Sequence, residues 1–460
     1  MELAGKNITV AGLGKTGRAL AEFLLHRGAK VTVSDSAPEK HLGDAPGALR
    51  QVGVRVELGG HAPDAFRNAD LIVLSPGVPH TIEPVKAARA GGVPVIGEIE
   101  LASGFITAPV VAVTGTNGKS TVTRLTGMML EKSGLSVFVG GNLGTPLISY
   151  AGGRQYADVV VAEISSFQLD TAYEFRPAVG VLLNISADHL DRYPDLRAYG
   201  ESKAKLFAKQ TPGDTAVLNA ADSLVLELTE NIRSRRCLFN SDAAAGCGAW
   251  IDRGGISLRT PGEGDFRIEA EDVFLPGLHN LENTAAAALA ALAAGANLKG
   301  VSEGLRDFEP DPHRMQWVAC VGGVNYYDDS KATNVDAAAR AVEAMDQPVV
   351  LILGGRDKGG GYRRLSGVIR RHVRALVLMG ESADTIYDEL GGIVETRRAC
   401  SMDDAVTKAR DLASYGETVL LSPACSSFDM YENYASRGAD FQRAVRSLES
   451  DGNGTQCREK

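Results

Sequence analysis

Short apolar runs rich in valine and isoleucine alternate along the chain with stretches of helical pattern. ITVAGLG near the start, PVVAVTGT in the first third and VVLILGG further on are examples. Such runs are continuously apolar and end in Gly, Ser, Asp or Asn, as strands do in parallel sheets covered on both faces. Their alternation with helices predicts an α/β protein.

The pattern divides into three units. We expect a Rossmann-like parallel sheet in residues 1–98, a central domain with a mixed sheet in 99–312, and a second Rossmann-like domain in 313–460. The mixed character of the central sheet follows from the stretch RRCLFN through EDVFLPG, which is typical of irregular antiparallel strands.

Composition excludes some functional classes. The 460 residues are 44% hydrophobic and carry a net charge of −9, which argues against broad nucleic-acid binding. The apolar run in the first residues is short, so we expect no signal peptide, and no apolar run is long enough to span a membrane. The six cysteines form no CxxC pair, so we expect neither a disulfide framework nor a zinc site, and thiols that are mostly inert in a reducing compartment.

The first candidate site is GLGKTG, from Gly12 to Gly17. A strand, G-x-G-x-x-G and a helix follow one another, and the next strand ends at Asp35, which is the dinucleotide fingerprint. The direct interpretation is NAD binding, but the same turn serves other diphosphates, and it also occurs without a ligand. Ser75 ends a further strand and is expected to line the same crevice.

The second candidate site is GTNGKST, a shortened Walker A motif in which Val113 stands at the place of the first glycine. Lys119 is placed for a β- or γ-phosphate and Ser120 for Mg²⁺, so we expect a nucleoside triphosphate. Glu163 follows an apolar strand, where a magnesium ligand would lie, and His189 follows the next one. Lys203 and Lys205 on their own are typical of a solvated helix face.

Polar clusters also follow strands in the third unit. Arg314 opens this unit, and an arginine from another domain can stabilise a transferring phosphate. DDSKATN, GGRDKGG and LSPACSSFDMYENY each come after a strand, which predicts a second substrate site.

Together, GTNGKST, EISSFQLD, NISADHLDRYP, DDSKATN, LGGRDK and LSPACSSFD closely resemble the Mur ligase family over nearly the whole chain. The resemblance implies an ATP-dependent amide ligase of peptidoglycan precursor synthesis in the cytoplasm, with UDP rather than NAD at the first loop. SSFQLD, DHLDRYP, DSKATN and SPACSSFD indicate the branch that adds D-glutamate to UDP-N-acetylmuramoyl-L-alanine through an acyl phosphate. We expect a monomer.

The resemblance also assigns roles residue by residue. The UDP substrate would contact Lys15, Thr16, Asp35, Ser36, Ser75, Asn142 and His189. ATP would contact Gly115, Thr116, Asn117, Gly118, Lys119, Ser120, Thr121, Asn283, Arg314 and Asp329. Two Mg²⁺ ions would use Ser120, Glu163, His189 and a carbamylated lysine, expected at Lys203 with Lys205 as the alternative. D-glutamate would contact Thr333, Lys358, Ser427, Phe428 and Tyr434. The catalytic set is Lys119, His189, Lys203 and Arg314.

Three other functions remain to be weighed. An NAD-dependent oxidoreductase would use GLGKTG but leaves GTNGKST, Glu163 and His189 unexplained. Another amide ligase of the family, such as a folylpolyglutamate synthase, would not need a first domain of the UDP-binding type. An inactive nucleotide-binding scaffold conflicts with the full set of phosphate and metal residues.

Overall fold

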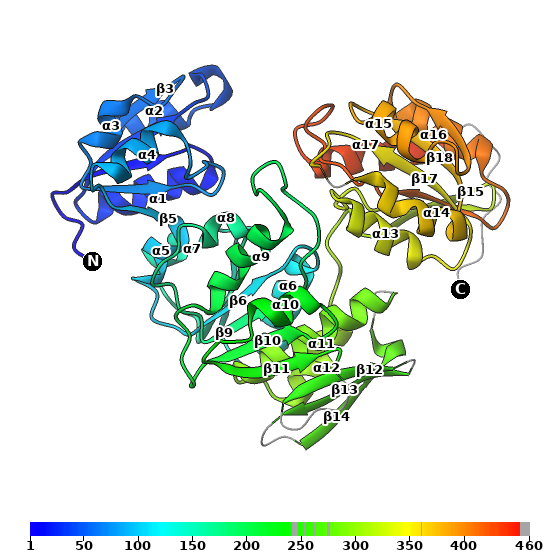
Figure 1. The fold of residues 1–460 in the computed structure, drawn as a ribbon, viewed down its shortest axis with the longest axis horizontal. Coiled ribbons are helices and arrows are strands. Elements are labelled where there is room, and N and C mark those ends of the chain that lie inside the picture. Colours follow the sequence, from blue (N-terminus) through cyan, green and yellow to red (C-terminus); the bar gives the residue numbers. More distant parts are fainter. Residues whose placement is uncertain (242–246, 253, 261–263, 274–276, 360, 451–460) are drawn as a thin grey trace. The chain divides into compact units, whose positions relative to one another are not determined.

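The computed structural model describes residues 1–241, 247–252, 254–260, 264–273, 277–359 and 361–450 (Figure 1). Contacts group the chain into two compact units. The first unit holds residues 1–185, 200–272 and 282–307, and the second holds 186–199, 273–281 and 308–460. The predicted α/β fold with three sheets is confirmed.

The N-terminal sheet has the strand order β3-β2-β1-β4-β5, and all its neighbouring strands are parallel. Apolar residues of β1 and β4 pack under two helices, where Ile72 and Leu74 meet Phe66 and Val85. The strands are β1 (Asn7–Ala11), β2 (Lys30–Asp35), β3 (Arg55–Leu58), β4 (Leu71–Leu74) and β5 (Val95–Gly97). The helices are α1 (Lys15–His26), α2 (Ala45–Gln51), α3 (Pro63–Arg67), α4 (Glu83–Ala90) and α5 (Glu98–Ser103), with the 3₁₀ helix η1 (Glu39–His41).

The central sheet has nine strands in the order β14-β13-β12-β11-β10-β9-β6-β8-β7. Its pairs from β7 to β12 are parallel, whereas β12, β13 and β14 pair antiparallel, so the predicted mixed sheet is confirmed. The strands are β6 (Val110–Thr114), β7 (Val137–Gly141), β8 (Val159–Glu163), β9 (Val179–Leu182), β10 (Thr215–Asn219), β11 (Arg235–Phe239), β12 (Gly248–Asp252), β13 (Gly255–Thr260) and β14 (Gly264–Glu269). Parts of the predicted antiparallel stretch, residues 242–246, 253, 261–263 and 274–276, lie outside the described residues.

Helices of the central part follow most of its parallel strands. They are α6 (Lys119–Lys132), α7 (Leu147–Gly152), α8 (Ser166–Leu169), α9 (Leu196–Ala204), α10 (Ser223–Leu228), α11 (Leu278–Ala293) and α12 (Leu298–Arg306), with the 3₁₀ helices η2 (Lys205–Phe207) and η3 (Ala270–Asp272). Helix α6 packs along α12. The chain passes between the two units within α9 and again within α11.

The C-terminal sheet has the order β15-β16-β20-β17-β18-β19, parallel except for the β15–β16 pair. The strands are β15 (Gln316–Val321), β16 (Val324–Asp328), β17 (Val349–Gly354), β18 (Val373–Met379), β19 (Glu395–Arg398) and β20 (Thr418–Leu421). The helices are α13 (Val335–Glu343), α14 (Ser366–His372), α15 (Ala383–Leu390), α16 (Met402–Leu412) and α17 (Tyr434–Ser450), with η4 (Tyr362–Leu365).

Both faces of the C-terminal sheet are buried. Leu351 and Leu353 of β17 belong to the apolar cluster that includes residues of α13, α14 and α15. Val350 and Ile352 belong to the cluster on the other face, under α16 and α17. Since successive side chains of a strand point to opposite faces, a strand covered on both sides must be apolar at every position, which explains the run VVLILG.

The cysteine prediction is wrong in part. Cys237 and Cys247 form a disulfide, with their Cα atoms 4.8 Å apart. They precede Leu238 of β11 and Gly248 of β12, which are paired residues of neighbouring strands, so the sheet brings the two thiols together. Cys320 is also disulfide-bonded, whereas Cys400 and Cys425 carry free thiols. Cys457 lies outside the described residues.

The three sheets fall within the three predicted ranges, 1–98, 99–312 and 313–460. Contacts, however, divide the chain into two units rather than three, so the predicted domain boundaries stay a prediction. Among the described residues, no helix is both long and apolar enough to cross a membrane.

Candidate functional site

The loop GLGKTG forms the turn between β1 and α1. A Cβ atom on Gly17 would lie 1.9 Å from the carbonyl oxygen of Gly12, so only glycine lets α1 start this close to the turn. The first main-chain amides of α1 follow directly, at the carboxyl edge of the sheet. A helix start at this edge is where anionic ligands bind in open α/β sheets.

A cavity of about 450 Å³ opens beside this turn in the first unit. Its volume lies in the range of sites for small molecules. The lining includes six of the seven residues predicted for the UDP substrate: Lys15, Thr16, Asp35, Ser36, Ser75 and Asn142. The seventh, His189, belongs to the second unit.

Hydrogen bonds fix the charged groups of this cavity. The Asp35 carboxylate accepts the main-chain N–H groups of Leu13 at 2.6 Å and Ala37 at 2.7 Å. Lys15 Nζ donates to the carbonyl oxygen of Gly144 at 2.6 Å. The carboxylate can therefore accept from a ligand hydroxyl at a set position, while the lysine places a positive charge in the cavity wall.

Sequence reasoning missed several lining residues, among them His61 and Gln168. His61 Nδ1 lies 2.9 Å from the buried hydroxyl of Ser34, and burial lowers the pKa of this imidazole below its usual value. The sequence feature that could have indicated His61 is the pair of glycines before it, which follows a strand. Gln168 lies within SSFQLD, a motif that was recognised as a whole but not residue by residue.

The second loop, GTNGKST, leads from β6 into α6. Gly118 has φ +85°, and a Cβ atom there would lie 2.2 Å from Asn283 Oδ1. Asn283 of α11, predicted to contact ATP, therefore lies against this loop. The left-handed glycine and the close amide together shape a narrow turn of backbone, as a phosphate-binding loop requires.

The lysine of this loop folds back over its own turn. Lys119 Nζ donates to the carbonyl oxygens of Gly115 at 2.9 Å and Thr116 at 2.7 Å. The main-chain N–H of Asn117 donates to Asn184 Oδ1 at 2.8 Å, which ties the loop to the segment after β9. Thr121 follows in the first turn of α6 and is buried. The seven predicted residues thus form the turn Gly115–Gly118 and the first three residues of α6, Lys119, Ser120 and Thr121.

Glu163, the last residue of β8, joins this loop to the cavity. Its Oε2 accepts the Ser120 hydroxyl at 2.6 Å, and its Oε1 accepts the Asn142 amide at 2.7 Å. Since Asn142 lines the cavity and Ser120 begins the loop helix, one buried carboxylate contacts both sites.

The structure separates the two candidate lysines. Lys203 is buried, with 1% of its surface exposed, and its Nζ donates to the carbonyl oxygen of Gly115 at 2.8 Å. Lys205 is partly exposed and pairs with Asp170 at 2.8 Å. Of the two lysines, only Lys203 reaches the GTNGKST loop, which favours it for the predicted role.

Oxygen atoms suited to Mg²⁺ are present at Ser120 and Glu163. The described residues contain no group of three or more His, Cys, Asp or Glu side chains arranged to hold a metal ion. The hydroxyl and carboxylate at the start of α6 fit a Mg²⁺ ion that is shared with nucleotide phosphates, since such ions keep several non-protein ligands.

A second group of predicted residues lies in the second unit. Asp188 accepts from Lys358 Nζ at 3.4 Å and from Asn334 Nδ2 at 3.2 Å. The main-chain N–H of His189 donates to the same Asp188 carboxylate at 2.9 Å, with His189 at φ +56°. These contacts link the segment after β9 with the loops after β16 and β17.

Asp329 is buried in this unit and interacts electrostatically with the partly buried Arg314. Burial raises the pKa of Asp329 to about 7, although the Ser422 hydroxyl donates to it at 2.8 Å and Arg314 attracts its charge. Arg314 Nε is buried without a hydrogen-bond partner. An unpaired buried guanidinium N–H costs free energy, which a ligand oxygen that accepted from it would recover.

The residues predicted for D-glutamate occupy three loops and a helix start, with Lys358 in the loop after β17. Thr333 lies between β16 and α13, and Ser427 and Phe428 follow β20. Ser427 is buried, whereas 63% of Phe428 is exposed. Tyr434 begins α17, where its hydroxyl accepts from Lys331 Nζ at 3.2 Å and its ring lies 4.9 Å from the same nitrogen. Lys331 is therefore a further cation of this region. It lies within the motif DDSKATN, but the sequence analysis assigned it no role.

The three parts of the chain match three family models. These describe the Mur ligase MurD-like N-terminal domain over residues 6–97, the Mur ligase middle domain over 113–291 and the Mur ligase glutamate ligase domain over 313–425. The chain belongs to the Mur ligase family.

Relatives align over almost the whole chain. The chain is 50% identical to a UDP-N-acetylmuramoylalanine--D-glutamate ligase of Desulfosudis oleivorans, covering 97% of this chain and 98% of that protein. A protein of the same name from Desulfatibacillum aliphaticivorans is 49% identical, covering 97% and 100%. Among solved structures, a pseudomurein peptide ligase type C from Methanothermus fervidus has a TM-score of 0.63 at 19% identity, covering 97% of this chain and 100% of that one. A UDP-N-acetylmuramate-alanine ligase from Thermotoga maritima has a TM-score of 0.58 at 19% identity, covering 97% and 100%. At this identity the structural likeness concerns the fold alone.

Proposed function

We propose that this protein is an ATP-dependent ligase that joins D-glutamate to UDP-N-acetylmuramoyl-L-alanine, releasing ADP and phosphate. The names of the relatives support this substrate pair. The observation that carries the proposal is that one unit holds both the cavity beside the GLGKTG turn and the GTNGKST loop. Glu163 accepts from Asn142 at that cavity and from Ser120 at the start of α6. The family resemblance supports a cytoplasmic enzyme, a monomer, and domain boundaries near residues 98 and 312.

The two turns have different ligands in this proposal. The cavity with Lys15, Thr16 and Asp35 takes the uridine diphosphate, and the loop with Lys119 and Ser120 takes ATP. An NAD-dependent oxidoreductase would use only the first turn, so the buried contacts of the second, including Lys203 and Asn283, would have no function. The ligase uses both.

The first chemical step is phosphoryl transfer. A carboxylate oxygen of the L-alanyl group attacks the γ-phosphorus of ATP, the bond to the β,γ-bridging oxygen breaks, and ADP leaves. Repulsion between the two anions opposes this approach, so catalysis depends on positioning and charge neutralisation. Lys119 supplies positive charge from the loop, and Arg314 Nε supplies an N–H group without an internal partner.

The second step forms the amide. The uncharged amine of D-glutamate attacks the acyl carbonyl, loses a proton, and phosphate leaves. Lys358 offers a cation for a D-glutamate carboxylate, and Thr333 and Ser427 offer hydroxyl groups. At present Lys358 pairs with Asp188 at 3.4 Å, an ion pair that an incoming carboxylate could replace.

Mg²⁺ fits the start of α6. Ser120 and Glu163 would hold it there, and it would screen the negative charge of the phosphates. The family resemblance implies a second ion, for which a carbamylated Lys203 would be a ligand in the first unit.

The test is phosphate release from ATP and Mg²⁺ with UDP-N-acetylmuramoyl-L-alanine and a panel of D- and L-amino acids. We expect release only when the nucleotide sugar and D-glutamate are both present. Release with a different amino acid would keep the ligase chemistry but overturn the roles of Thr333, Lys358 and Ser427. A rate of ATP hydrolysis that is the same with and without the two co-substrates would overturn the proposal.

A further inference from the structure

Arg437 lies near the start of α17 with only 2% of its surface exposed. Burial lowers the pKa of its guanidinium to about 10, so it stays charged at neutral pH. Burying a charge costs free energy, and an apolar side chain of similar size would often stabilise a core as well or better. Packing alone therefore does not explain why a charged side chain is buried at residue 437.

The guanidinium joins separate segments of the second unit. Its Nε donates to the Ser330 hydroxyl at 2.9 Å, and its Nη2 donates to the carbonyl oxygens of Ser330 at 2.8 Å and Cys425 at 3.1 Å. The Ser330 hydroxyl donates in turn to the carbonyl oxygen of Tyr434 at 2.8 Å. One side chain thus connects the loop after β16, the loop after β20 and the first turn of α17.

These are the segments that carry most of the residues assigned to D-glutamate. Thr333 lies three positions after Ser330, and Ser427 two positions after Cys425. The main-chain carbonyl oxygen of Tyr434 accepts a hydrogen bond from the Ser330 hydroxyl. None of the Arg437 contacts involves the assigned side chains themselves, so the guanidinium acts on the backbone that places them.

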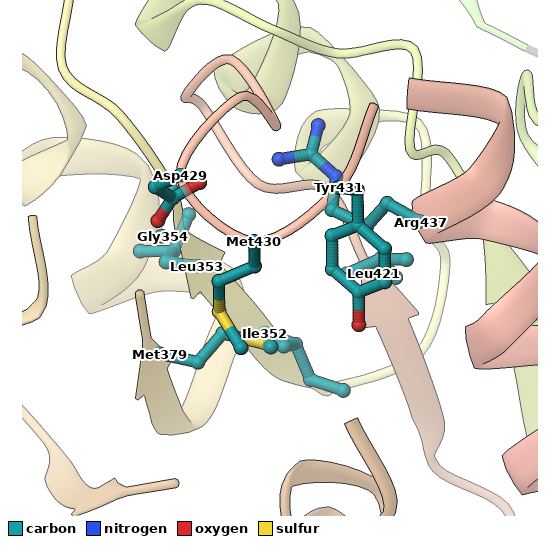
Figure 2. Close-up of a pocket in the computed structure, with 10 residues that line it drawn as sticks. Ile352, Leu353, Gly354, Met379, Leu421, Asp429, Met430, Tyr431 and Arg437 are labelled. Carbon is teal, nitrogen blue, oxygen red and sulfur yellow. The ribbon is translucent and has the colours of Figure 1, made fainter. Parts of the chain in front are cut away.

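The remaining nitrogen of Arg437 lies at a small cavity. Nη1 is buried without a hydrogen-bond partner. The cavity measures about 10 Å³ and its lining includes Gly355, Asp429 and Tyr431 (Figure 2). This is about the space of one water molecule. A Cβ atom on Gly355 would lie 3.1 Å from Nη1, so the glycine leaves room for this edge of the guanidinium.

We propose that Arg437 is a positioning residue for the amino-acid site, holding the loops after β16 and β20 and the start of α17 in the arrangement that binds D-glutamate. This inference rests on the proposed function. Since a displacement of about 1 Å in a binding group can cost about 100-fold in rate, loss of the cross-link should weaken use of the amino acid above all. The nucleotide sugar is assigned to other segments. Of the residues assigned to ATP, Asp329 lies on the loop after β16, but its carboxylate is held by the Ser422 hydroxyl and the main-chain N–H of Met315 rather than by Arg437.

The test compares steady-state kinetics of the wild type with Arg437→Lys, Arg437→Gln and Ser330→Ala. Ser330→Ala removes the acceptor of Nε without removing the charge. Arg443→Lys is the matched control, because Arg443 lies on the same helix but is exposed and pairs with Asp403 and Asp440. Thermal unfolding of each variant reports whether it is folded.

We expect KM for D-glutamate to rise about 10- to 100-fold in the Arg437 variants and in the same direction in Ser330→Ala. KM for ATP and for the nucleotide sugar should stay within about two-fold, as should every parameter of Arg443→Lys. Added guanidinium ion should partly restore the KM of Arg437→Gln. The inference fails if KM for D-glutamate is unchanged in folded variants, or if all three KM values rise together. A wild type that does not use D-glutamate would instead overturn the proposed function.

Discussion

The ammonium group of Lys203 donates a hydrogen bond of 2.8 Å to the main-chain carbonyl of Gly115, 88 positions earlier in the chain. The contact brings a lysine from the end of α9 to the phosphate-binding loop, where Lys119 donates to the same carbonyl oxygen at 2.9 Å. Two cations on one carbonyl repel each other, so this arrangement favours conversion of one of them to an anion or its pairing with a phosphate.

We therefore predict that Lys203 becomes a carbamate. Incubation with carbon-13 bicarbonate should give one carbamate signal in the wild type that disappears in Lys203→Arg and persists in Lys205→Arg. Ligase activity should fall about 100-fold or more in Lys203→Arg and stay within about two-fold in Lys205→Arg, whose lysine pairs with Asp170 at the surface. An active Lys203→Arg enzyme would contradict this role.

The Ser120–Glu163 pair should control the use of Mg²⁺. Glu163→Gln keeps the shape and the Ser120 contact but removes the negative charge that would hold the ion. We expect kcat/KM to fall about 100-fold or more and the Mg²⁺ concentration for half-maximal activity to rise. Titration of Mg²⁺ at saturating ATP measures both. A variant with an unchanged Mg²⁺ requirement would show that the ion does not use this carboxylate.

Glu98 should make the stability of the first unit depend on pH. It is 1% exposed and accepts the main-chain N–H of Ile148 at 2.7 Å, yet burial raises its pKa from 4.5 to about 7. The folded state therefore holds this proton at pH values where the unfolded state has lost it. Stability falls as pH rises from about 4.5 to about 7, by about 3 kcal/mol at most.

Glu98→Gln, which stays neutral, should remove this part of the pH dependence. The midpoint of thermal unfolding, measured from pH 4.5 to pH 8, should fall less steeply in the variant than in the wild type. Glu174→Gln is a suitable control because that carboxylate is largely exposed, at 75% of its side-chain surface. Parallel curves for the wild type and Glu98→Gln would contradict the prediction.

The Cys237–Cys247 disulfide should stabilise the outer part of the central sheet. It closes a loop of 10 residues between β11 and β12, so its loss should lower the free energy of unfolding by about 2–3 kcal/mol. The double variant Cys237→Ser/Cys247→Ser tests this better than a reductant, because Cys320 is disulfide-bonded as well. Activity at low temperature should be unchanged, since neither cysteine lines the cavity. Both thiols reacting with an alkylating agent in the native protein would contradict the bond.

Much of the fold could be predicted because α/β sheets require short apolar runs that alternate with helical stretches. Strands covered on both faces, such as β17, are apolar at each position, and the loops that bind phosphate need glycine at fixed intervals. The pattern could not reveal the disulfide, because Cys247 comes 10 positions after Cys237 and only the pairing of β11 with β12 brings them together.

The sites were harder to predict where a residue acts through three-dimensional contacts. His61 follows an ordinary glycine turn, and only the fold brings its ring to Ser34 and the cavity. Lys203 and Lys205 are indistinguishable as sequence, but one is buried at the phosphate loop and the other pairs at the surface. Arg437 makes its contacts with backbone carbonyls and a hydroxyl, for which no sequence pattern exists.

Glu163 connects the cavity beside GLGKTG with the start of α6. Its two oxygens are occupied by Asn142 on one side and Ser120 on the other. A ligand that draws Asn142 away from the carboxylate changes how strongly the other oxygen attracts a cation at Ser120. Coupling of this kind is reciprocal, so the factor by which the nucleotide sugar changes the affinity for ATP must equal the factor by which ATP changes the affinity for the nucleotide sugar. A single carboxylate that contacts both the cavity and the start of α6 would thus make binding at the two places heterotropically linked, with no movement of a whole domain required.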